Sequence, residues 1–141
     1  MEKKVLAFDF GASGGRAMCG TFDGDKISIE ELHRFSNDPV ILNGSMYWDV
    51  LRLFFEIKQG LIKAKKCGKI ESIGIDTWGV DFALIGKDGE LLRNPYCYRD
   101  PHTVGAPEEY FTHIPRERVY DITGIQIMNF NSLFQLSTLH R

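Results

Sequence analysis

The stretch Val5-Leu-Ala-Phe-Asp9-Phe-Gly11-Ala-Ser13-Gly14-Gly15-Arg16 organises the fold of this chain. Its first four residues are apolar and predict a buried strand that ends at Asp9. Small residues then form a tight turn, and the residues from Ala17 to Phe22 have the composition of a second strand. A glycine- and serine-rich turn between two strands leaves backbone N–H groups available to an anion. The stretch therefore predicts a phosphate-binding hairpin.

The polar residues of this stretch suit the chemistry of a metal-bound phosphate. Asp9 could hold Mg²⁺ through water, while Ser13 and Arg16 supply side-chain donors to phosphate oxygens. A Walker loop is excluded because no Lys follows the glycines, and a Rossmann fingerprint because the glycine spacing is wrong. The alternative is an ordinary glycine-rich hairpin in which Arg16 is solvated and Asp9 caps the turn.

Length and composition indicate a globular protein. The chain has 141 residues and a formal net charge of −2, with 43% hydrophobic and 26% charged residues. We expect one domain, and the charge gives no reason to propose nucleic acid or an anionic membrane as a partner. Cys19, Cys67 and Cys97 are widely spaced without a C-x-x-C pair, which favours reduced thiols over a disulfide frame or a zinc site. Asp9 cuts the first apolar run and no other run could span a bilayer, so we expect a cytoplasmic location.

The segments after the hairpin predict a third strand and a long helix. Alternating apolar residues from Ile27 to Phe35 indicate a strand that completes an antiparallel meander, followed by a loop over residues 36–45. Asp49 is a good N-cap, and Gly68 can end the helix. The helix should bury the apolar residues that recur at helical spacing, namely Val50, Leu51, Phe54, Ile57, Leu61 and Ala64.

A strand over residues 70–75 is expected next, central in the sheet and ending at Asp76. A strand, helix, strand order implies a right-handed crossover, which makes this strand parallel to the first. Asp9 and Asp76 should then lie at the same carboxyl edge, where α/β sheets bind ligands. Residues 80–92 predict a hairpin that extends from this strand.

The last third of the chain predicts a loop and short helices. Residues 94–107 form a loop by composition, and residues 108–113 and 116–122 are helical candidates. Asn131 could cap a last helix, which has neither Gly nor Pro to end it. We therefore expect the chain to be part of a larger protein.

Two further features of the sequence resemble a known family. Three strands, a helix and a parallel strand open the α/β ribonuclease-H-like fold of sugar kinases, actin and heat-shock ATPases, which has a mixed sheet and flanking helices. Within that superfamily, the segment Gly74-Ile-Asp76-Thr77-Trp78-Gly79-Val80-Asp81-Phe82 resembles the sugar-side segment of the FGGY carbohydrate kinases. Later segments of this chain also resemble that family, in the same order along the sequence. They are Tyr98-Arg99-Asp100, Gly124-Ile-Gln126, Phe130-Asn131 and Gln135-Leu136.

The resemblance implies ATP-dependent phosphoryl transfer to the 1-hydroxyl of L-rhamnulose, with L-fuculose as the nearest competing substrate. The ATP-phosphate loop then corresponds to Ala12, Ser13, Gly14, Gly15 and Arg16, with Mg²⁺ at Asp9. Where relatives often have a second hydroxyl residue, this chain has Gly14.

On the sugar side, Gly79 matches a sugar-contacting position, Trp78 would wall the pocket, and Asp81 could accept a sugar hydroxyl. Alternatives are a core Trp78 and a turn-capping Asp81. Arg99 and Asp100 could line the pocket rim or form a structural ion pair. His102 stands near where related kinases often have Arg, and an exposed loop histidine is the simpler reading.

The resemblance also defines what we expect to lie outside this sequence. Residues 1–141 correspond to the N-terminal part of the first, sugar-binding domain, so the catalytic Asp and the ATP-binding C-terminal domain of such kinases are expected beyond residue 141. The expected partners are a ketose, MgATP, the remainder of the kinase and, through exposed apolar surface, other copies of the chain. An actin-like or chaperone-type ATPase domain is the competing class, and a pure sugar-binding or interaction domain is a third.

Overall fold

A computed structural model describes residues 2–139 and divides them into two compact units. The sheet unit comprises residues 2–38 and Asp49–Gly79, and the second unit comprises Pro39–Trp48 and residues 80–139. The length of the chain led us to expect a single domain. The two units alternate along the chain, which leaves the sheet unit twice, at Asp38 and at Gly79.

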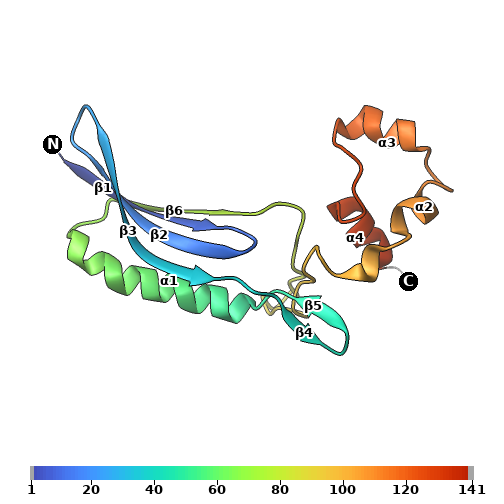
Figure 1. The fold of residues 1–141 in the computed structure, drawn as a ribbon, viewed down its shortest axis with the longest axis horizontal. Helices are drawn as coiled ribbons and strands as arrows, with labels where there is room; N and C mark the ends of the chain where they lie inside the picture. Colours follow the sequence, from blue (N-terminus) through green and yellow to red (C-terminus); the bar gives the residue numbers. More distant parts are fainter. Residues whose placement is uncertain (1, 140–141) are drawn as a thin grey trace. The chain divides into compact units, whose positions relative to one another are not determined.

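The sheet unit contains the predicted antiparallel meander and a parallel fourth strand (Figure 1). Strands β1 (Lys3–Phe10), β2 (Gly14–Phe22), β3 (Ile27–Ser36) and β6 (Ser72–Thr77) lie in the order β3-β2-β1-β6. β1 pairs antiparallel with β2 and parallel with β6. The prediction of a mixed sheet is therefore confirmed, because the chain returns to β6 through a helix.

One face of the sheet is covered by helix α1 (Val50–Ala64), which continues into the 3-10 turn η1 (Lys65–Cys67) (Figure 1). The Asp49 side chain caps it by accepting a hydrogen bond from the backbone N–H of Arg52, as predicted. The core beneath it contains Leu6, Phe8 and Phe10 of β1 with Ala17 and Cys19 of β2.

The face that α1 buries differs in part from the predicted one. Ala64 is buried as predicted, but Leu51 and Phe54 are 78% and 58% exposed, and Glu56 and Gly60 are buried instead. A Cβ at Gly60 would lie 2.5 Å from the Phe8 ring, so the helix approaches the sheet too closely there for a larger residue. Helical spacing located the helix and Ala64 but not Gly60, the small residue that allows this close packing.

The fourth strand lies at an edge among the described residues, not in the centre as predicted. All six residues of β6 are exposed, including Ile73 and Ile75. Both isoleucines pair with α1-facing residues of β1, namely Leu6 and Phe8. An exposed edge strand with apolar side chains is a surface on which further chain or another copy could pair.

The second unit contains a hairpin where the sequence predicted a loop. β4 (Val40–Leu42) and β5 (Ser45–Tyr47) are joined by Asn43-Gly44, whose φ values of 51° and 81° suit the two-residue type I′ turn that Asn-Gly favours. The hairpin predicted over residues 80–92 is reduced to one bridge between Ile85 and Leu91, closed by a turn at Gly86–Gly89.

Four short helical segments complete the second unit. They are η2 (Pro101–Thr103), α2 (Ala106–Tyr110), α3 (Arg116–Thr123) and α4 (Ser132–Thr138). The predicted helices are confirmed to within a few residues. The Asn131 side chain, however, does not cap α4: its Oδ1 accepts from the backbone N–H of Met128 at 2.6 Å.

Two expectations about environment can be compared with the described residues. Cys19, Cys67 and Cys97 are free thiols in the structure. Between residues 2 and 139, we find no helix with the length and apolar character needed to cross a membrane.

Candidate phosphate and sugar sites

A row of charged residues crosses the sheet unit near the carboxyl end of β1. In register, Asp76 of β6 pairs with Asp9 of β1, Asp9 with Arg16 of β2, and Arg16 with Arg34 of β3. Directly paired residues of neighbouring strands point to the same face, here the face opposite α1. The row therefore has two carboxylates on one half and two guanidinium groups on the other, and Arg16 forms an ion pair with Asp9.

The predicted phosphate hairpin is the turn beside this row. The backbone N–H of Gly11 donates to the carbonyl of Gly14 at 2.9 Å and closes the turn. A Cβ at Gly15 would lie 2.2 Å from the Phe35 ring, so only glycine allows this approach of β3. Asp9, Ser13 and Arg16 line a surface depression of about 790 Å³ here, together with Gly11, Gly14, Gly15, Arg34, Phe35 and Ser36.

Asn37 holds this turn from behind and was not singled out by the sequence. Its Nδ2 donates to the Gly11 carbonyl at 3.0 Å, and its backbone N–H donates to the Ser13 carbonyl at 3.3 Å. Asn37 is 6% exposed. Because two carbonyls of the turn are bonded toward Asn37, the turn can present N–H groups on its other side. The one feature of the sequence that could have pointed to Asn37 is its position directly after β3, the strand that pairs with Gly14.

The two carboxylates of the row fit a magnesium site that is completed by phosphate. Among the described residues no group of three or more His, Cys, Asp or Glu side chains could hold a metal by itself. Mg²⁺ commonly binds through one or two carboxylates and takes its other ligands from water and substrate phosphates. Asp9 and Asp76, adjacent on one face at the strand ends, match that donor set.

Trp78 and Gly79 end the sheet unit. The Trp78 side chain packs against the hydrophobic core of the sheet unit, and its backbone N–H donates to the Phe10 carbonyl at 3.1 Å. Gly79 is exposed, and a Cβ there would meet no other atom within 4 Å. The packing of Trp78 favours the core alternative for at least part of its ring.

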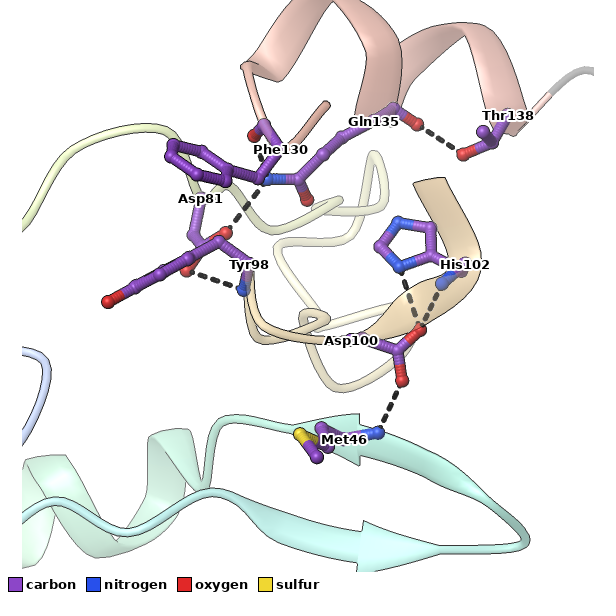
Figure 2. Close-up of polar contacts among 8 residues, drawn as sticks. All are labelled: Met46, Asp81, Tyr98, Asp100, His102, Phe130, Gln135 and Thr138. Carbon is purple, nitrogen blue, oxygen red and sulfur yellow. Dashed lines mark hydrogen bonds and ion pairs between the residues drawn. The ribbon is translucent and has the colours of Figure 1, made fainter. Parts of the chain in front are cut away.

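Asp81 lies at the centre of a hydrogen-bond network in the second unit (Figure 2). Its Oδ2 accepts from the Trp48 indole N–H at 2.6 Å and from the Tyr98 backbone N–H at 3.3 Å. Its Oδ1 accepts from the Gln135 side chain at 2.9 Å. Trp48 is 1% exposed, so this carboxylate satisfies a buried donor. Trp48 was not among our candidates, although an indole N–H in a core requires an acceptor.

Asp100 also binds donors from separate parts of the second unit (Figure 2). One oxygen accepts from the backbone N–H of Met46 at 2.6 Å, and the other accepts from the backbone N–H of His102 and lies 2.9 Å from His102 Nδ1. Asp100 is 3% exposed. Its side-chain partner is His102, whereas the guanidinium of the neighbouring Arg99 lies 5.1 Å from the centre of the Tyr98 ring.

The expectation of an exposed His102 is wrong. Its side chain is 16% exposed, and its ring stacks on Tyr96 with the ring centres 4.2 Å apart. Tyr96 in turn stacks on Tyr47 of β5 at 4.9 Å. A histidine that follows a loop proline becomes half-buried because the Tyr96 ring and the Asp100 carboxylate contact it.

Comparison with known sequences finds rhamnulokinases. A rhamnulokinase from Bacteroides thetaiotaomicron is 54% identical over 142 residues, covering 100% of this chain and 29% of that protein. A rhamnulokinase from Ligilactobacillus salivarius is 44% identical over 135 residues, covering 95% of this chain and 28% of that protein. The chain thus spans less than a third of the length of these relatives. No family model matches it.

Comparison with solved structures finds sugar kinases. A gluconate kinase from Lactobacillus acidophilus superposes with a TM-score of 0.82 at 16% identity, covering 100% of this chain and 29% of that one. A ligand-bound xylulose kinase from the same organism has a TM-score of 0.82 at 16% identity, covering 99% and 28%. At such low identity the likeness concerns the fold, and it confirms the ribonuclease-H-like class.

Proposed function

Because this chain belongs to the FGGY family of carbohydrate kinases, we propose that it is the phosphate-binding part of an ATP-dependent kinase acting on L-rhamnulose. The product would be L-rhamnulose 1-phosphate. The chain spans less than a third of its rhamnulokinase relatives, so the proposed activity belongs to a protein that also contains the remainder. We place residues 1–141 in the N-terminal, sugar-binding domain of that protein, in the cytoplasm.

The charged row on the sheet unit is the observation that carries this proposal. Phosphoryl transfer depends on positioned phosphates and on neutralisation of their charge, with little covalent chemistry for the protein. Asp9 and Asp76 would hold Mg²⁺, which would supply positive charge to neutralise the phosphates. Arg16, the Ser13 hydroxyl and the backbone N–H groups of the turn from Ala12 would bind the phosphates directly.

The sugar side of the proposal rests on the segment Gly74–Phe82. Gly79 has open space around it and could lie against a sugar, with the exposed edge of Trp78 as the wall. Asp81 and Asp100 already accept hydrogen bonds from several donors. Within the second unit, we therefore assign both carboxylates to holding its segments in place, and we propose Arg99 and the remaining lone pairs of Asp81 as sugar contacts.

No residue between 2 and 139 is proposed as the proton acceptor. Asp9 is paired with Arg16 and would face Mg²⁺, and Asp76 accepts from the backbone N–H of Thr77 at 3.0 Å. A carboxylate in the remainder of the kinase would accept the proton of the sugar hydroxyl.

A chimeric kinase tests the proposal. This chain would replace the segment of the B. thetaiotaomicron rhamnulokinase to which it is 54% identical. ADP release would then be measured with MgATP and either L-rhamnulose or L-fuculose, with the unmodified relative and a sugar-free blank as controls. We expect turnover with L-rhamnulose as the better substrate. A folded chimera that hydrolyses ATP without needing a sugar, or that prefers L-fuculose, would contradict the proposal.

A further inference from the structure

The charged row contains one cation that neither the sequence nor the proposed function used. Arg34 of β3 pairs in register with Arg16 and lies on the same face of the sheet. It lines the same depression as Ser13, Gly14 and Arg16. Two guanidinium groups on adjacent strands at one level of a sheet repel each other unless anions lie near them.

Each arginine is balanced by a carboxylate of its own. Arg16 pairs with Asp9, and Arg34 pairs with Glu31 through two bonds, Nε to Oε1 at 3.0 Å and Nη2 to Oε2 at 2.5 Å. These bonds hold the pKa of the Glu31 carboxyl below its ordinary value, so the pair is ionised at neutral pH. The Arg34 side chain is 63% exposed and that of Glu31 41%.

An exposed pair of this kind is easily exchanged for a better partner. Exposed ion pairs contribute little to stability because water competes with them. A polyphosphate carries more charge than one carboxylate and offers several oxygens to the planar fork of an arginine. Gly14 pairs directly with Ser36, which is two residues from Arg34 in the same strand. An anion bound at the turn beside Gly14 would therefore lie near Arg34.

We propose that Arg34 is a second phosphate-binding cation, which exchanges Glu31 for the polyphosphate of MgATP when the nucleotide binds. The proposal rests on the proposed kinase function and adds a residue to its phosphate site. Glu31 then has a role of its own: it neutralises Arg34 in the empty site and competes with the nucleotide. The two residues should have opposite effects on nucleotide affinity, which a simple surface ion pair does not produce.

The test uses the chimeric kinase with the variants Arg34→Gln, Glu31→Gln and Arg16→Ala. The dissociation constants of MgATP and of magnesium tripolyphosphate are measured by calorimetry without sugar, so the readout does not depend on activity. Arg118→Gln, an exposed position on α3, is the control for loss of one positive charge. Thermal melting of every variant checks the fold.

We expect Arg34→Gln to weaken both ligands about tenfold, as for loss of a partly exposed bond to a charged group. Glu31→Gln should strengthen binding about threefold by removing a competing exposed pair. Adenosine should be unaffected by either change. The melting temperature should fall slightly and equally in both variants, because each breaks the same ion pair.

Three results would overturn the proposal, and they separate it from the function it rests on. If Arg16→Ala weakens MgATP but Arg34→Gln does not, Arg34 is a surface residue and the kinase proposal stands. The same conclusion follows if Glu31→Gln and Arg34→Gln change affinity in the same direction. If neither Arg16→Ala nor Arg34→Gln affects MgATP, the phosphate site itself is wrong.

Discussion

The carboxylates beside the phosphate turn of the sheet unit and those of the second unit are held in opposite ways. Asp9 has a side chain that is 39% exposed and an ion pair with Arg16, whereas Asp100 is 3% exposed and bonds Met46 and His102. A carboxylate with open lone pairs can accept a metal or a ligand. A carboxylate whose oxygens are occupied by buried donors stabilises the chain segments around it. Exposure and bonding therefore distinguish Asp9 from Asp100, although the resemblance alone implies a ligand-binding role for both.

The largest effect we expect is the loss of catalysis in the isolated chain, because the open carboxylates Asp9 and Asp76 do not act as the general base. The 141-residue chain by itself should show no sugar-dependent ADP release with MgATP and L-rhamnulose. Without a positioned proton acceptor the rate should fall by about 10²–10⁴-fold, before loss of domain closure is counted. A coupled ADP-release assay against a blank without sugar measures it. Turnover at rates ordinary for kinases would make Asp9 or Asp76 the general base.

The next prediction tests the occupied carboxylates. Asp81→Ala should lower the free energy of unfolding by about 3 kcal/mol, because unsatisfied donors remain on buried Trp48 and on Gln135. Urea unfolding followed by tryptophan fluorescence measures it, with Asp121→Ala on the exposed face of α3 as the control. A stable variant with a raised KM for the ketose would instead make Asp81 a sugar contact.

A third prediction concerns Glu56, an occupied carboxylate within the sheet unit. Glu56 is 2% exposed and bonds His33 Nε2 and Arg52 Nε, each at 2.5 Å. Burial alone would raise its pKa, but the bonds from His33 and Arg52 outweigh burial, and the pKa lies below the ordinary value of 4.5. Glu56→Gln should therefore lower stability at neutral pH by about 2 kcal/mol.

The pH dependence of that effect has a definite sign. The folded pKa of Glu56 lies below the unfolded one, so its stabilisation is complete above the ordinary value of 4.5 and is lost as pH falls through the lower folded pKa. Thermal melts of the chain and of Glu56→Gln, taken from pH 7 down to acid, should converge at low pH. A stability difference that grew toward acid pH would show that the carboxylate is not the stabilising group.

The smallest effect is expected at Arg16. Its side chain is 41% exposed, so Arg16→Ala should leave stability nearly unchanged while raising the KM for MgATP about tenfold in the chimeric kinase. The KM for the ketose should stay constant. Steady-state kinetics with each substrate varied in turn measures the split. If the variant instead has a lower melting temperature and unchanged kinetics, the ion pair of Arg16 with Asp9 stabilises the fold and Arg16 does not bind phosphate.

Much of the sheet unit could be predicted from local patterns. Alternation and a charged strand end located β1, β2 and β3, and the order of strand, helix and strand implied that β6 runs parallel to β1. That order placed Asp9 and Asp76 at one edge, and the register confirms it. Handedness and strand direction follow from backbone sterics, so they can be read without knowledge of distant contacts.

The second unit was predicted less well because its structure depends on contacts between distant segments. Three contacts of this kind fix the second unit: Tyr47 of β5 bridges to Tyr96, the backbone N–H of Met46 donates to Asp100, and the Trp48 indole donates to Asp81. From local composition, we predicted loops over residues 36–45 and 94–107. Only the Asn43-Gly44 pair carried a local signal, for a tight hairpin turn.

By itself the sequence determined the antiparallel meander, the helix that crosses the sheet, the direction of β6, and the resemblance that identifies the family. Only the tertiary structure decided which carboxylates are open and which are occupied, which face of α1 is buried, and that Arg34 joins the charged row. The physical reason is that periodicity is a property of neighbouring residues. Burial and hydrogen-bond satisfaction are properties of the partners that folding brings from elsewhere in the chain.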